Sequence, residues 1–168
     1  MTLYLITGPA GVGKSSVSKV LCEKLEKSVL IEGDDIYNLV QSSYISPWKE
    51  GNHLEYFWKN SLDLIKNSLE FGYDVVFNYI LSQQNLEKIK ATFPNVQIKF
   101  VCLLCDAKTL LFRDSLRPSD CQMKERCLVL LEGFKQKAFD ERFILLAQDN
   151  LSIDDEAEII LRDTRFIL

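Results

Sequence analysis

A glycine-rich stretch near the N-terminus constrains the fold of this 168-residue chain more than any other feature. Residues 8–15 read Gly-Pro-Ala-Gly-Val-Gly-Lys-Ser, which matches the pattern GxxxxGK[ST]. An apolar run at 2–7 precedes the stretch, and apolar residues at helical spacing follow it over 14–25. A strand, a glycine-rich turn and a helix N-terminus in this order present several backbone N–H groups to an anion. The stretch therefore predicts a phosphate-binding loop, or P-loop.

Each part of this loop has an expected task. Lys14 is expected to reach the β- and γ-phosphates of a nucleotide, and the Ser15 hydroxyl is expected to ligate Mg²⁺. Ser16 either touches a phosphate or only occupies the first helical turn. The expected cofactors are ATP and Mg²⁺, and no base-reading motif distinguishes ATP from GTP. The nucleotide-binding residues predicted in the loop are Gly8, Ala10, Gly11, Val12, Gly13, Lys14, Ser15 and Ser16.

Strand-like and helix-like segments alternate along the rest of the chain. Strands are predicted at 2–7, 28–31, 73–81, 96–105 and 143–146. Helices are predicted at 14–25, 36–41, 52–71, 84–92, 106–113, 121–137 and 153–161, with Asp106 as an N-cap. This alternation predicts an α/β fold with a parallel sheet covered on both faces. The length and the 47% hydrophobic content fit a single domain over 1–168.

Carboxylates follow the second predicted strand, in the sequence Glu32-Gly33-Asp34-Asp35. Ligands of open α/β sheets bind at the carboxyl ends of the strands. Asp34 or Asp35 is therefore predicted to orient an acceptor hydroxyl and take its proton, with Asp35 preferred, and Asp34 could also hold a water on Mg²⁺. The alternative is that both residues only cap a helix that begins at Ile36.

Basic residues cluster around a helix break at 118–120. Arginines can neutralise the charge that spreads over the γ-phosphoryl oxygens in the transition state, and a flat guanidinium can stack on adenine. The cluster predicts a lid at about 113–126 that closes over ATP. The alternative is a solvated helix face paired with Asp114, Asp120 and Glu125. The basic residues are Arg113, Arg117, Lys124 and Arg126.

Residues 36–72 are predicted to cover the acceptor. Aromatic faces at Trp48, Phe57 and Trp58 could bind a sugar or an aromatic ring, although the spacing of Phe57 and Trp58 fits the core better. His53, the sole histidine, is expected at the surface or as a cap. No arginine pair suits a nucleoside monophosphate here, which favours a neutral or weakly charged acceptor.

Together these residues resemble the small P-loop kinases, a group that includes gluconate kinase, shikimate kinase, chloramphenicol phosphotransferase and adenylate-kinase-like enzymes. The chain is most similar to AAA-type ATPase/kinase-like members described as gluconate kinases. The resemblance implies a P-loop NTPase fold, with a five-stranded parallel sheet in the order 2-3-1-4-5 flanked by helices, and an arginine-bearing lid. Shikimate is not favoured as the acceptor, because no glycine-rich acceptor signature follows the third strand.

The resemblance also implies roles for individual residues. Lys14, Asp34 or Asp35, and Arg117 or Arg126 would form the catalytic set, and Arg113 would stack on adenine. Asn150, in the loop after the fifth strand, would lie near the base. Many relatives carry an aspartate at the end of the third strand, where this chain has Asn78. The metal would then depend on Ser15, waters and Asp34.

Charge and composition exclude several other classes. The net charge of −4 gives no basic excess for nucleic acid, and no apolar run approaches the ~20 residues that span a bilayer. Five cysteines without framework spacing, and no leader segment, predict a cytoplasmic protein. We expect a monomer or homodimer that phosphorylates a hydroxyl of a small-molecule acceptor. The alternatives are an ATPase module without such an acceptor, or a polynucleotide 5′-hydroxyl kinase.

Overall fold

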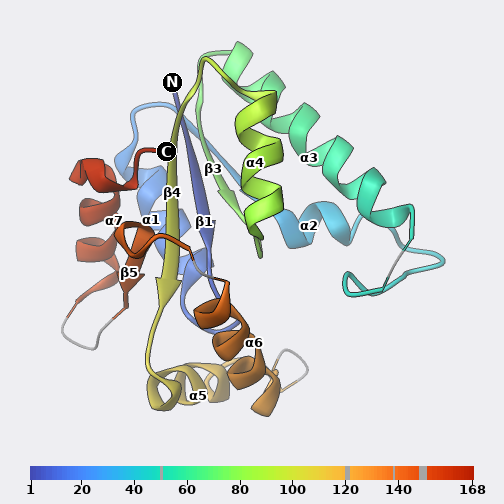
Figure 1. The fold of residues 1–168 in the computed structure, drawn as a ribbon, viewed down its shortest axis with the longest axis vertical. Helices are drawn as coiled ribbons and strands as arrows, with labels where there is room; N and C mark the ends of the chain where they lie inside the picture. The colour runs from blue at the N-terminus through green and yellow to red at the C-terminus, as the bar shows by residue number, and fades with distance from the viewer. Residues whose placement is uncertain (50, 120–121, 138, 148–150) are drawn as a thin grey trace.

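One sheet of five parallel strands organises the chain (Figure 1). The computed structural model describes residues 1–168 apart from 50, 120–121, 138 and 148–150. The order of the strands is β2-β3-β1-β4-β5, which confirms the predicted P-loop NTPase topology. The strands are β1 (Thr2–Thr7), β2 (Ser28–Glu32), β3 (Asp74–Asn78), β4 (Gln97–Leu104) and β5 (Ile144–Leu146).

Helices cover both faces of this sheet (Figure 1). α1 (Lys14–Lys24) and α7 (Ile153–Arg162) pack against each other on one face. α3 (His53–Glu70) and α4 (Gln83–Thr92) lie on the other face. Beyond the carboxyl ends of the strands lie α2 (Gly33–Tyr37), α5 (Ala107–Ser115) and α6 (Glu125–Gln136), of which α5 and α6 pack together.

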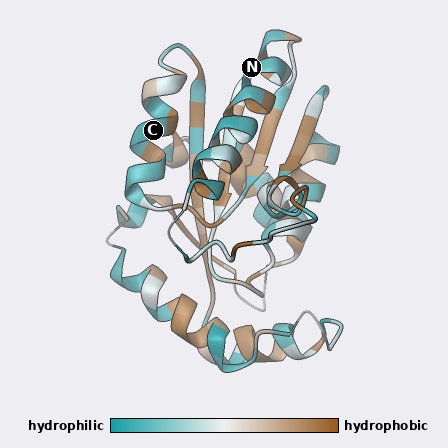
Figure 2. Cartoon of the chain, turned by 90° about the vertical axis from the view of Figure 1, so that its right-hand side faces the viewer, coloured by the Kyte–Doolittle hydropathy of each residue, from teal (hydrophilic) through white to brown (hydrophobic). Residues whose placement is uncertain are grey.

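The central strands are buried on both faces, as continuous apolar runs require. Leu5 and Ile6 of β1 and Phe100 of β4 are fully buried. Figure 2 shows mostly hydrophobic strands between helices that carry hydrophilic residues on their outer sides. The core therefore sits between the sheet and its helices, and the carboxyl ends of the strands remain available for a site.

Side-chain caps fix where several helices begin. Asp106 accepts hydrogen bonds from the backbone N–H groups of Lys108 and Thr109, both at 2.9 Å, which confirms its predicted role as an N-cap. Ser82 and Ser152 form capping boxes at the starts of α4 and α7. These caps satisfy backbone donors that would otherwise lack partners, and they hold the loops at the carboxyl edge of the sheet.

The starts of two helices differ from the prediction by three or four residues. α2 begins at Gly33 rather than Ile36, so Asp34 and Asp35 lie inside its first turn, and neither is the N-cap residue. α6 begins at Glu125 rather than Cys121. The carboxylate of Asp114 accepts hydrogen bonds from the backbone N–H groups of Met123 and Lys124, which holds this segment out of a helix.

Two further expectations concern membranes and thiols. Across the described residues, none of the helices has the length and apolar character needed to cross a bilayer. Cys102 and Cys105, which form a CxxC sequence, are both buried. Burial raises the pKa of the Cys102 thiol to about 12, so this group is not a nucleophile at neutral pH.

Candidate active site

The P-loop owes its shape to glycines with backbone angles that other residues rarely adopt. Gly13, the N-cap residue of α1, has φ 112°, and Gly8 has φ 145°. A Cβ atom at Gly8 would lie 2.3 Å from the carbonyl oxygen of Leu103 in β4. Only glycine fits there, because the clash would be with backbone that cannot move aside. The loop is thereby held against the carboxyl end of β4.

Lys14 lies within this curl and is already oriented. Its Nζ donates hydrogen bonds to the carbonyl oxygens of Gly8 and Pro9, both at 3.0 Å. Burial lowers the pKa of Lys14 to about 8, although the carboxylates of Asp34 and Glu32 act in the opposite direction. A phosphate placed in the loop would add negative charge and favour the protonated ammonium.

Three polar side chains meet where α1 approaches the ends of β2 and β3. Ser15 Oγ donates to Glu32 Oε2 at 3.3 Å, and Asn78 Nδ2 donates to Ser15 Oγ at 3.1 Å and to Glu32 Oε2 at 2.5 Å. The parallel register pairs Glu32 directly with Asn78, so the two strands deliver both side chains to one point. Burial raises the pKa of Glu32, while the hydrogen bonds from Ser15 and Asn78 oppose that shift.

This cluster fits a hydrated Mg²⁺ on a bound nucleotide. Glu32 Oε1 and Asn78 Oδ1 are buried, and neither has a hydrogen-bond partner among the residues that the structure describes. Both are oxygen acceptors beside the Ser15 hydroxyl, and Mg²⁺ in nucleotide sites keeps several waters that need such acceptors. Sequence reasoning noted Glu32 but did not select it. The signal that could have found it is its position at a strand end beside the predicted site.

A cavity of about 1000 Å³ joins the P-loop to the region covered by α2 and α3. The predicted residues that line it are Ala10, Gly11, Gly13, Lys14, Ser15, Ser16, Asp34, Arg113, Arg117 and Arg126. Gly8 and Val12 shape the loop from behind, and the predicted Asn150 lies outside the described residues.

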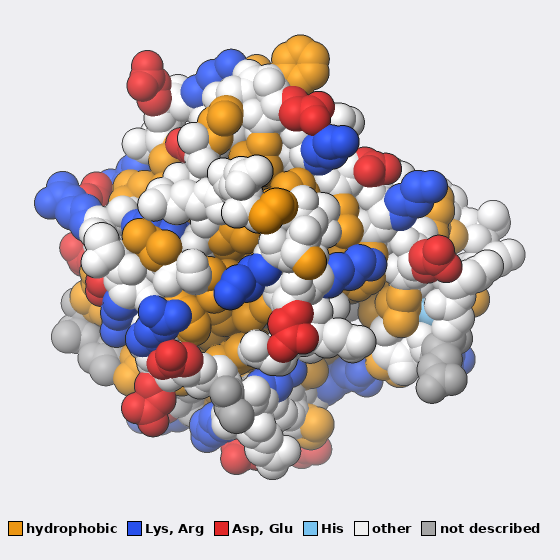
Figure 3. Space-filling model, turned by 45° about the horizontal axis from the view of Figure 1, so that its top comes forward, with side chains coloured by type: hydrophobic (Ala, Val, Ile, Leu, Met, Phe, Trp, Pro, Cys, Tyr) orange, Lys and Arg blue, Asp and Glu red, His pale blue; other side chains and the backbone are white. Residues whose placement is uncertain are grey.

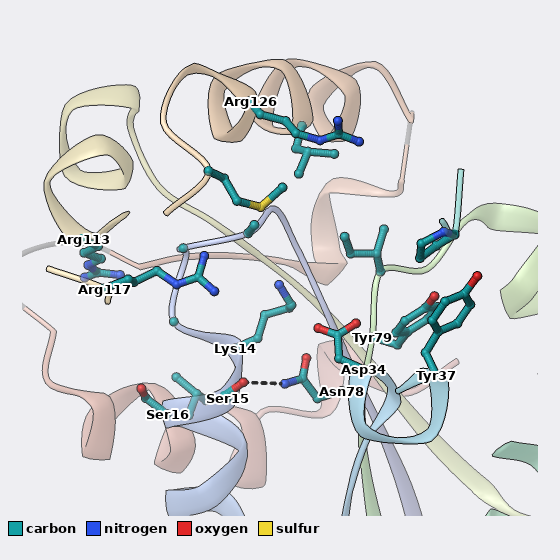
Figure 4. Close-up of a pocket in the computed structure, with 18 of the residues that line it drawn as sticks. Lys14, Ser15, Ser16, Asp34, Tyr37, Asn78, Tyr79, Arg113, Arg117 and Arg126 are labelled. Carbon is teal, nitrogen blue, oxygen red and sulfur yellow. Dashed lines mark hydrogen bonds between the residues drawn. The ribbon is translucent and has the colours of Figure 1, made fainter. Parts of the chain in front are cut away.

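The two aspartates of α2 differ in position. Asp34 lines the cavity and points toward Lys14 in Figure 4, whereas Asp35 is not among the lining residues. Both side chains are exposed, and they follow each other on a helix, so they face different directions. Of the two aspartates, Asp34 is therefore the one that can meet a ligand in the cavity, whereas the sequence favoured Asp35.

The arginines of the predicted lid have distinct partners. Arg113 Nη1 donates to the carbonyl oxygen of Val12 at 2.8 Å, which ties α5 to the P-loop. Arg117 Nη1 lies 3.3 Å from Asp114 Oδ1. Arg126 belongs to the first turn of α6. Its guanidinium lies 4.2 Å from the ring centroid of Trp48, a residue of the loop before α3. Asp114, which was predicted only as an ion-pair partner, also holds the backbone of the lid.

Aromatic rings form the acceptor side of the cavity. Tyr37 and Tyr79 line it, and neither was selected from the sequence. Phe57 is buried as predicted, while Trp58 is half-buried and also lines the cavity. His53 is half-buried and is not the N-cap of α3, which is Asn52. Among the described residues both of its ring nitrogens are buried without partners, and the ring packs edge-on against Tyr37.

The comparisons with known proteins agree with this fold. A family model described as an AAA domain matches residues 5–129, which is more than half of the chain. The chain belongs to this AAA domain family. A search of curated proteins finds no match to the chain.

Several solved structures are similar to this AAA domain protein. A gluconokinase from Sinorhizobium meliloti 1021 is 21% identical, with a TM-score of 0.65 over 95% of this chain and 89% of that chain. The APS kinase of Mycobacterium tuberculosis, in complex with AMPPNP and APS, is 16% identical, with a TM-score of 0.67 over 95% of each chain. A tunicamycin resistance protein of Deinococcus radiodurans is 18% identical, with a TM-score of 0.62 over 95% of this chain and 92% of that chain. These similarities show the fold of the P-loop kinases.

Proposed function

We propose that this protein is an ATP-dependent phosphotransferase that moves the γ-phosphoryl group to a hydroxyl of a small molecule. The observation that carries the proposal is the placement of Lys14 and Asp34 close together in one cavity (Figure 4). This arrangement puts a phosphate-binding cation next to a group that can accept the proton of an acceptor. Family membership and the fold of P-loop kinases support the same reaction class.

On the nucleotide side, the P-loop amides and Lys14 would hold the β- and γ-phosphates. Arg117 lines the cavity from the lid and is the arginine best placed to reach the transferring group, while Arg113 is fixed beside the loop. Charge that spreads over the phosphoryl oxygens would be neutralised by groups that are already oriented, which is the main source of catalysis in phosphoryl transfer.

Ser15 would hold Mg²⁺, with Glu32 and Asn78 accepting hydrogen bonds from its waters. When bound, the metal ion supplies positive charge that neutralises the β- and γ-phosphate oxygens. In this arrangement Asn78 fixes the Ser15 hydroxyl and the Glu32 carboxylate, and it takes the place of the aspartate expected at the end of β3.

On the acceptor side, Asp34 would accept a hydrogen bond from the hydroxyl that is phosphorylated. As the hydroxyl oxygen bonds to the γ-phosphorus, the bond from that phosphorus to the β,γ-bridging oxygen breaks, and ADP leaves with the electron pair. The hydroxyl proton passes to Asp34. Asp35, outside the cavity, has no part in this step.

The proposal is tested by measuring ADP release with and without acceptors, for the matched variants Asp34→Asn and Asp35→Asn. We expect Asp34→Asn to lose about 10²–10⁴-fold in acceptor-dependent turnover, the usual range for a general base. Asp35→Asn should stay within about twofold of the wild type, and both should bind MgATP normally. Full activity of Asp34→Asn, or ADP release that no acceptor stimulates, would contradict the proposal.

A nucleic-acid acceptor is not favoured. The net charge of −4 gives no basic excess. On the face shown in Figure 3, which is turned away from the carboxyl ends of the strands, basic and acidic side chains are interspersed. A polynucleotide kinase would need a continuous basic surface to follow the phosphate backbone.

A further inference from the structure

The part of the cavity between Asp34 and α6, here called the acceptor compartment, has mainly aromatic and apolar walls. Its polar side chains are few, and its rings come from α2, from the loop before α3, from α3 itself and from the residue after β3. The rings and apolar groups that line it are Tyr37, Tyr44, Pro47, Trp48, Trp58 and Tyr79. Such a surface binds flat or apolar groups through contact area rather than through charge.

The inner rings of this compartment are held in place by their neighbours. Tyr79 packs against Phe57 with 4.5 Å between ring centroids, and against Trp58 with 6.1 Å. On its other side lies Gly33, where a Cβ atom would come within 2.4 Å of the Tyr79 ring. Tyr37 in turn packs against Phe57 with 5.7 Å between centroids. The inner wall is therefore a preformed surface.

The outer rings are available to a ligand. Trp48 is 66% exposed and Tyr44 is 53% exposed, although both line the cavity. In the described structure, the main partner of the Trp48 face is the guanidinium of Arg126. Exposed aromatic rings in a cavity that also contains Asp34 are an unusual feature of a protein surface. A ligand that covers these rings removes apolar area from water, which favours binding.

The charges of the cavity do not favour an anionic acceptor. Lys14 is committed to the P-loop, Arg117 pairs with Asp114, and Arg126 stacks on Trp48. The charged group that faces the compartment from α2 is the carboxylate of Asp34. An acceptor carboxylate or phosphate would meet this negative charge, and to pair with a cation of the compartment it would have to draw on the Arg126 guanidinium that stacks on Trp48.

Building on the proposed phosphotransferase function, we propose that the acceptor is an uncharged small molecule with a flat aromatic or heteroaromatic ring and a free hydroxyl. The ring lies against Trp48 and Tyr44, and the hydroxyl reaches Asp34. The Arg126 guanidinium then covers the ring or gives up its place on Trp48 to it. This class of acceptor differs from sugar acids, which carry a carboxylate and no flat ring.

The test uses a panel of matched acceptors in the presence of Mg·ADP and then MgATP. Aryl alcohols and nucleosides are compared with their carboxylated or phosphorylated counterparts and with gluconate. Both tryptophans of the chain, Trp48 and Trp58, line the cavity, so intrinsic fluorescence reports binding without turnover. We expect neutral ring compounds to quench the fluorescence and to be phosphorylated with at least tenfold higher kcat/KM than their anionic counterparts.

The matched variants are Trp48→Ala and Phe71→Ala. Phe71, at the far end of α3, is an exposed ring as well (76%, against 66% for Trp48), and it is not among the residues that line the cavity. We expect Trp48→Ala to raise the acceptor KM about tenfold and to leave MgATP binding unchanged, Trp48→Phe to recover most of the loss, and Phe71→Ala to match the wild type.

The outcomes separate this inference from the proposed function. Tighter binding of the anionic counterparts, or equal behaviour of Trp48→Ala and Phe71→Ala, would overturn the inference while the phosphotransferase function stands. Neutral ring compounds could instead quench the fluorescence in a way that depends on Trp48 and yet stimulate no ADP release. That result would overturn the proposed phosphotransferase function and would leave the acceptor compartment as a binding site for such rings.

A second inference concerns recognition of the purine base of the nucleotide, and it rests on a separate observation. Glu156 of α7 lines the cavity although its side chain is 3% exposed, and no described residue donates a hydrogen bond to its carboxylate. Gly13, Val17 and Ile153 also line the cavity. Burial raises the pKa of Glu156, and the charge of Arg113 opposes that shift. A carboxylate of a buried residue that lines a ligand cavity can accept a hydrogen bond from a donor on the ligand.

We infer that Glu156 accepts a hydrogen bond from an amino group of the purine base. For ATP this group is the N6 amino group of adenine, and for GTP it would be the 2-amino group of guanine. A base with a hydrogen or a carbonyl oxygen at that position leaves the buried carboxylate without a partner, which is strongly unfavourable. Glu156 thereby determines base specificity, which the sequence pattern leaves open.

Two nucleotide pairs that differ in one amino group test this role. Equilibrium binding is measured for ATP against purine riboside triphosphate, and for GTP against inosine triphosphate. We expect at least a tenfold preference for ATP over its desamino analogue, and no more than about twofold in Glu156→Gln, which can donate as well as accept. The control Asp154→Asn alters an exposed carboxylate of the same helix and should keep the preference.

A preference confined to the GTP and inosine triphosphate pair would identify guanine as the base and would retain Glu156 as its acceptor. Equal binding within both pairs, or an unchanged preference in Glu156→Gln, would overturn the inference.

Discussion

The two halves of the cavity are built by different means. On the nucleotide side, backbone geometry defines the site, because Gly8 and Gly13 have φ angles of 145° and 112° and Lys14 is held by loop carbonyls. On the acceptor side, packed rings define it, with Phe57 at the centre and Tyr37, Trp58 and Tyr79 around it. A backbone-built site requires particular residues at fixed spacing, whereas a ring-built site can be assembled from many sequences.

The polar groups of the two halves differ in the same way. Ser15, Glu32 and Asn78 form a connected hydrogen-bond cluster beneath the P-loop. The outer acceptor compartment instead has the exposed ring of Trp48 in contact with Arg126. The first half is thus prepared for one chemical group, the phosphates of a nucleotide, while the second can be adapted to different acceptors by changing a few side chains.

The largest effect is expected from Lys14→Ala, which removes the charge of the nucleotide half. Acceptor-dependent kcat/KM should fall by about 10³-fold, because an oriented cation on the transferring phosphates is lost. The free energy of unfolding should change by no more than about 1 kcal/mol, since Lys14 bonds only to loop carbonyls. Steady-state kinetics and denaturant unfolding measure both. Lys19→Ala, an exposed lysine on the same helix, should match the wild type, and equal losses in the two variants would contradict this assignment.

In the acceptor half, Phe57→Ala tests whether packed rings hold the compartment. We expect the free energy of unfolding to fall by about 3–4 kcal/mol, because a fully buried ring leaves a cavity. The neighbouring Tyr56 is 51% exposed, so Tyr56→Ala should cost less than about 1 kcal/mol. Urea denaturation followed by circular dichroism compares the pair. A small loss for Phe57→Ala would mean that the aromatic wall does not depend on this ring.

Asn78→Ala should reveal the metal-supporting role of the polar cluster. Without Asn78, Ser15 and Glu32 lose their common donor, and the Mg²⁺ concentration for half-maximal activity should rise about tenfold. A magnesium titration at saturating ATP measures the shift. Asn67→Ala, at an exposed site of α3, is the control. An unchanged magnesium requirement would remove Asn78 from the proposed metal site.

The smallest predicted effect is the pH dependence of nucleotide binding. Burial lowers the pKa of Lys14 to about 8, so the ammonium that binds phosphate is lost as the pH rises through this value. Between pH 7 and pH 8.5 the protonated fraction falls about fourfold, and MgATP affinity should weaken by the same factor. Calorimetric titrations across this range measure it. The dependence should vanish in Lys14→Ala, and its persistence there would assign it to another group.

Sequence reasoning predicted the two halves unequally for physical reasons. The P-loop, the parallel sheet and the N-cap at Asp106 follow from local spacing and periodicity, whereas the strand order came from the resemblance to P-loop kinases. The structure confirms the strand order and this cap. Tyr37 and Tyr79 lie far apart in the sequence and both pack on Phe57, so no local pattern identifies them. Glu156 lies on a helix after β5 and reaches the cavity because α7 packs on α1.

The boundary differences have a similar origin. The start of α6 depends on the carboxylate of Asp114, which binds backbone groups nine and ten residues later in the chain. The choice between Asp34 and Asp35 depends on the first residue of α2, since a shift of one position on a helix turns a side chain by about 100°. Local propensity does not determine either feature, because tertiary contacts decide both.

The central claim is that backbone amides of the P-loop and Lys14 bind the phosphates of a magnesium-complexed nucleotide. Isothermal titration calorimetry of the folded protein with MgATP tests it most directly. We predict saturable binding with one nucleotide per chain, which Lys14→Ala weakens by at least tenfold and Lys19→Ala does not change. An absence of measurable binding by the folded wild-type protein, or binding that Lys14→Ala leaves intact, would contradict the account.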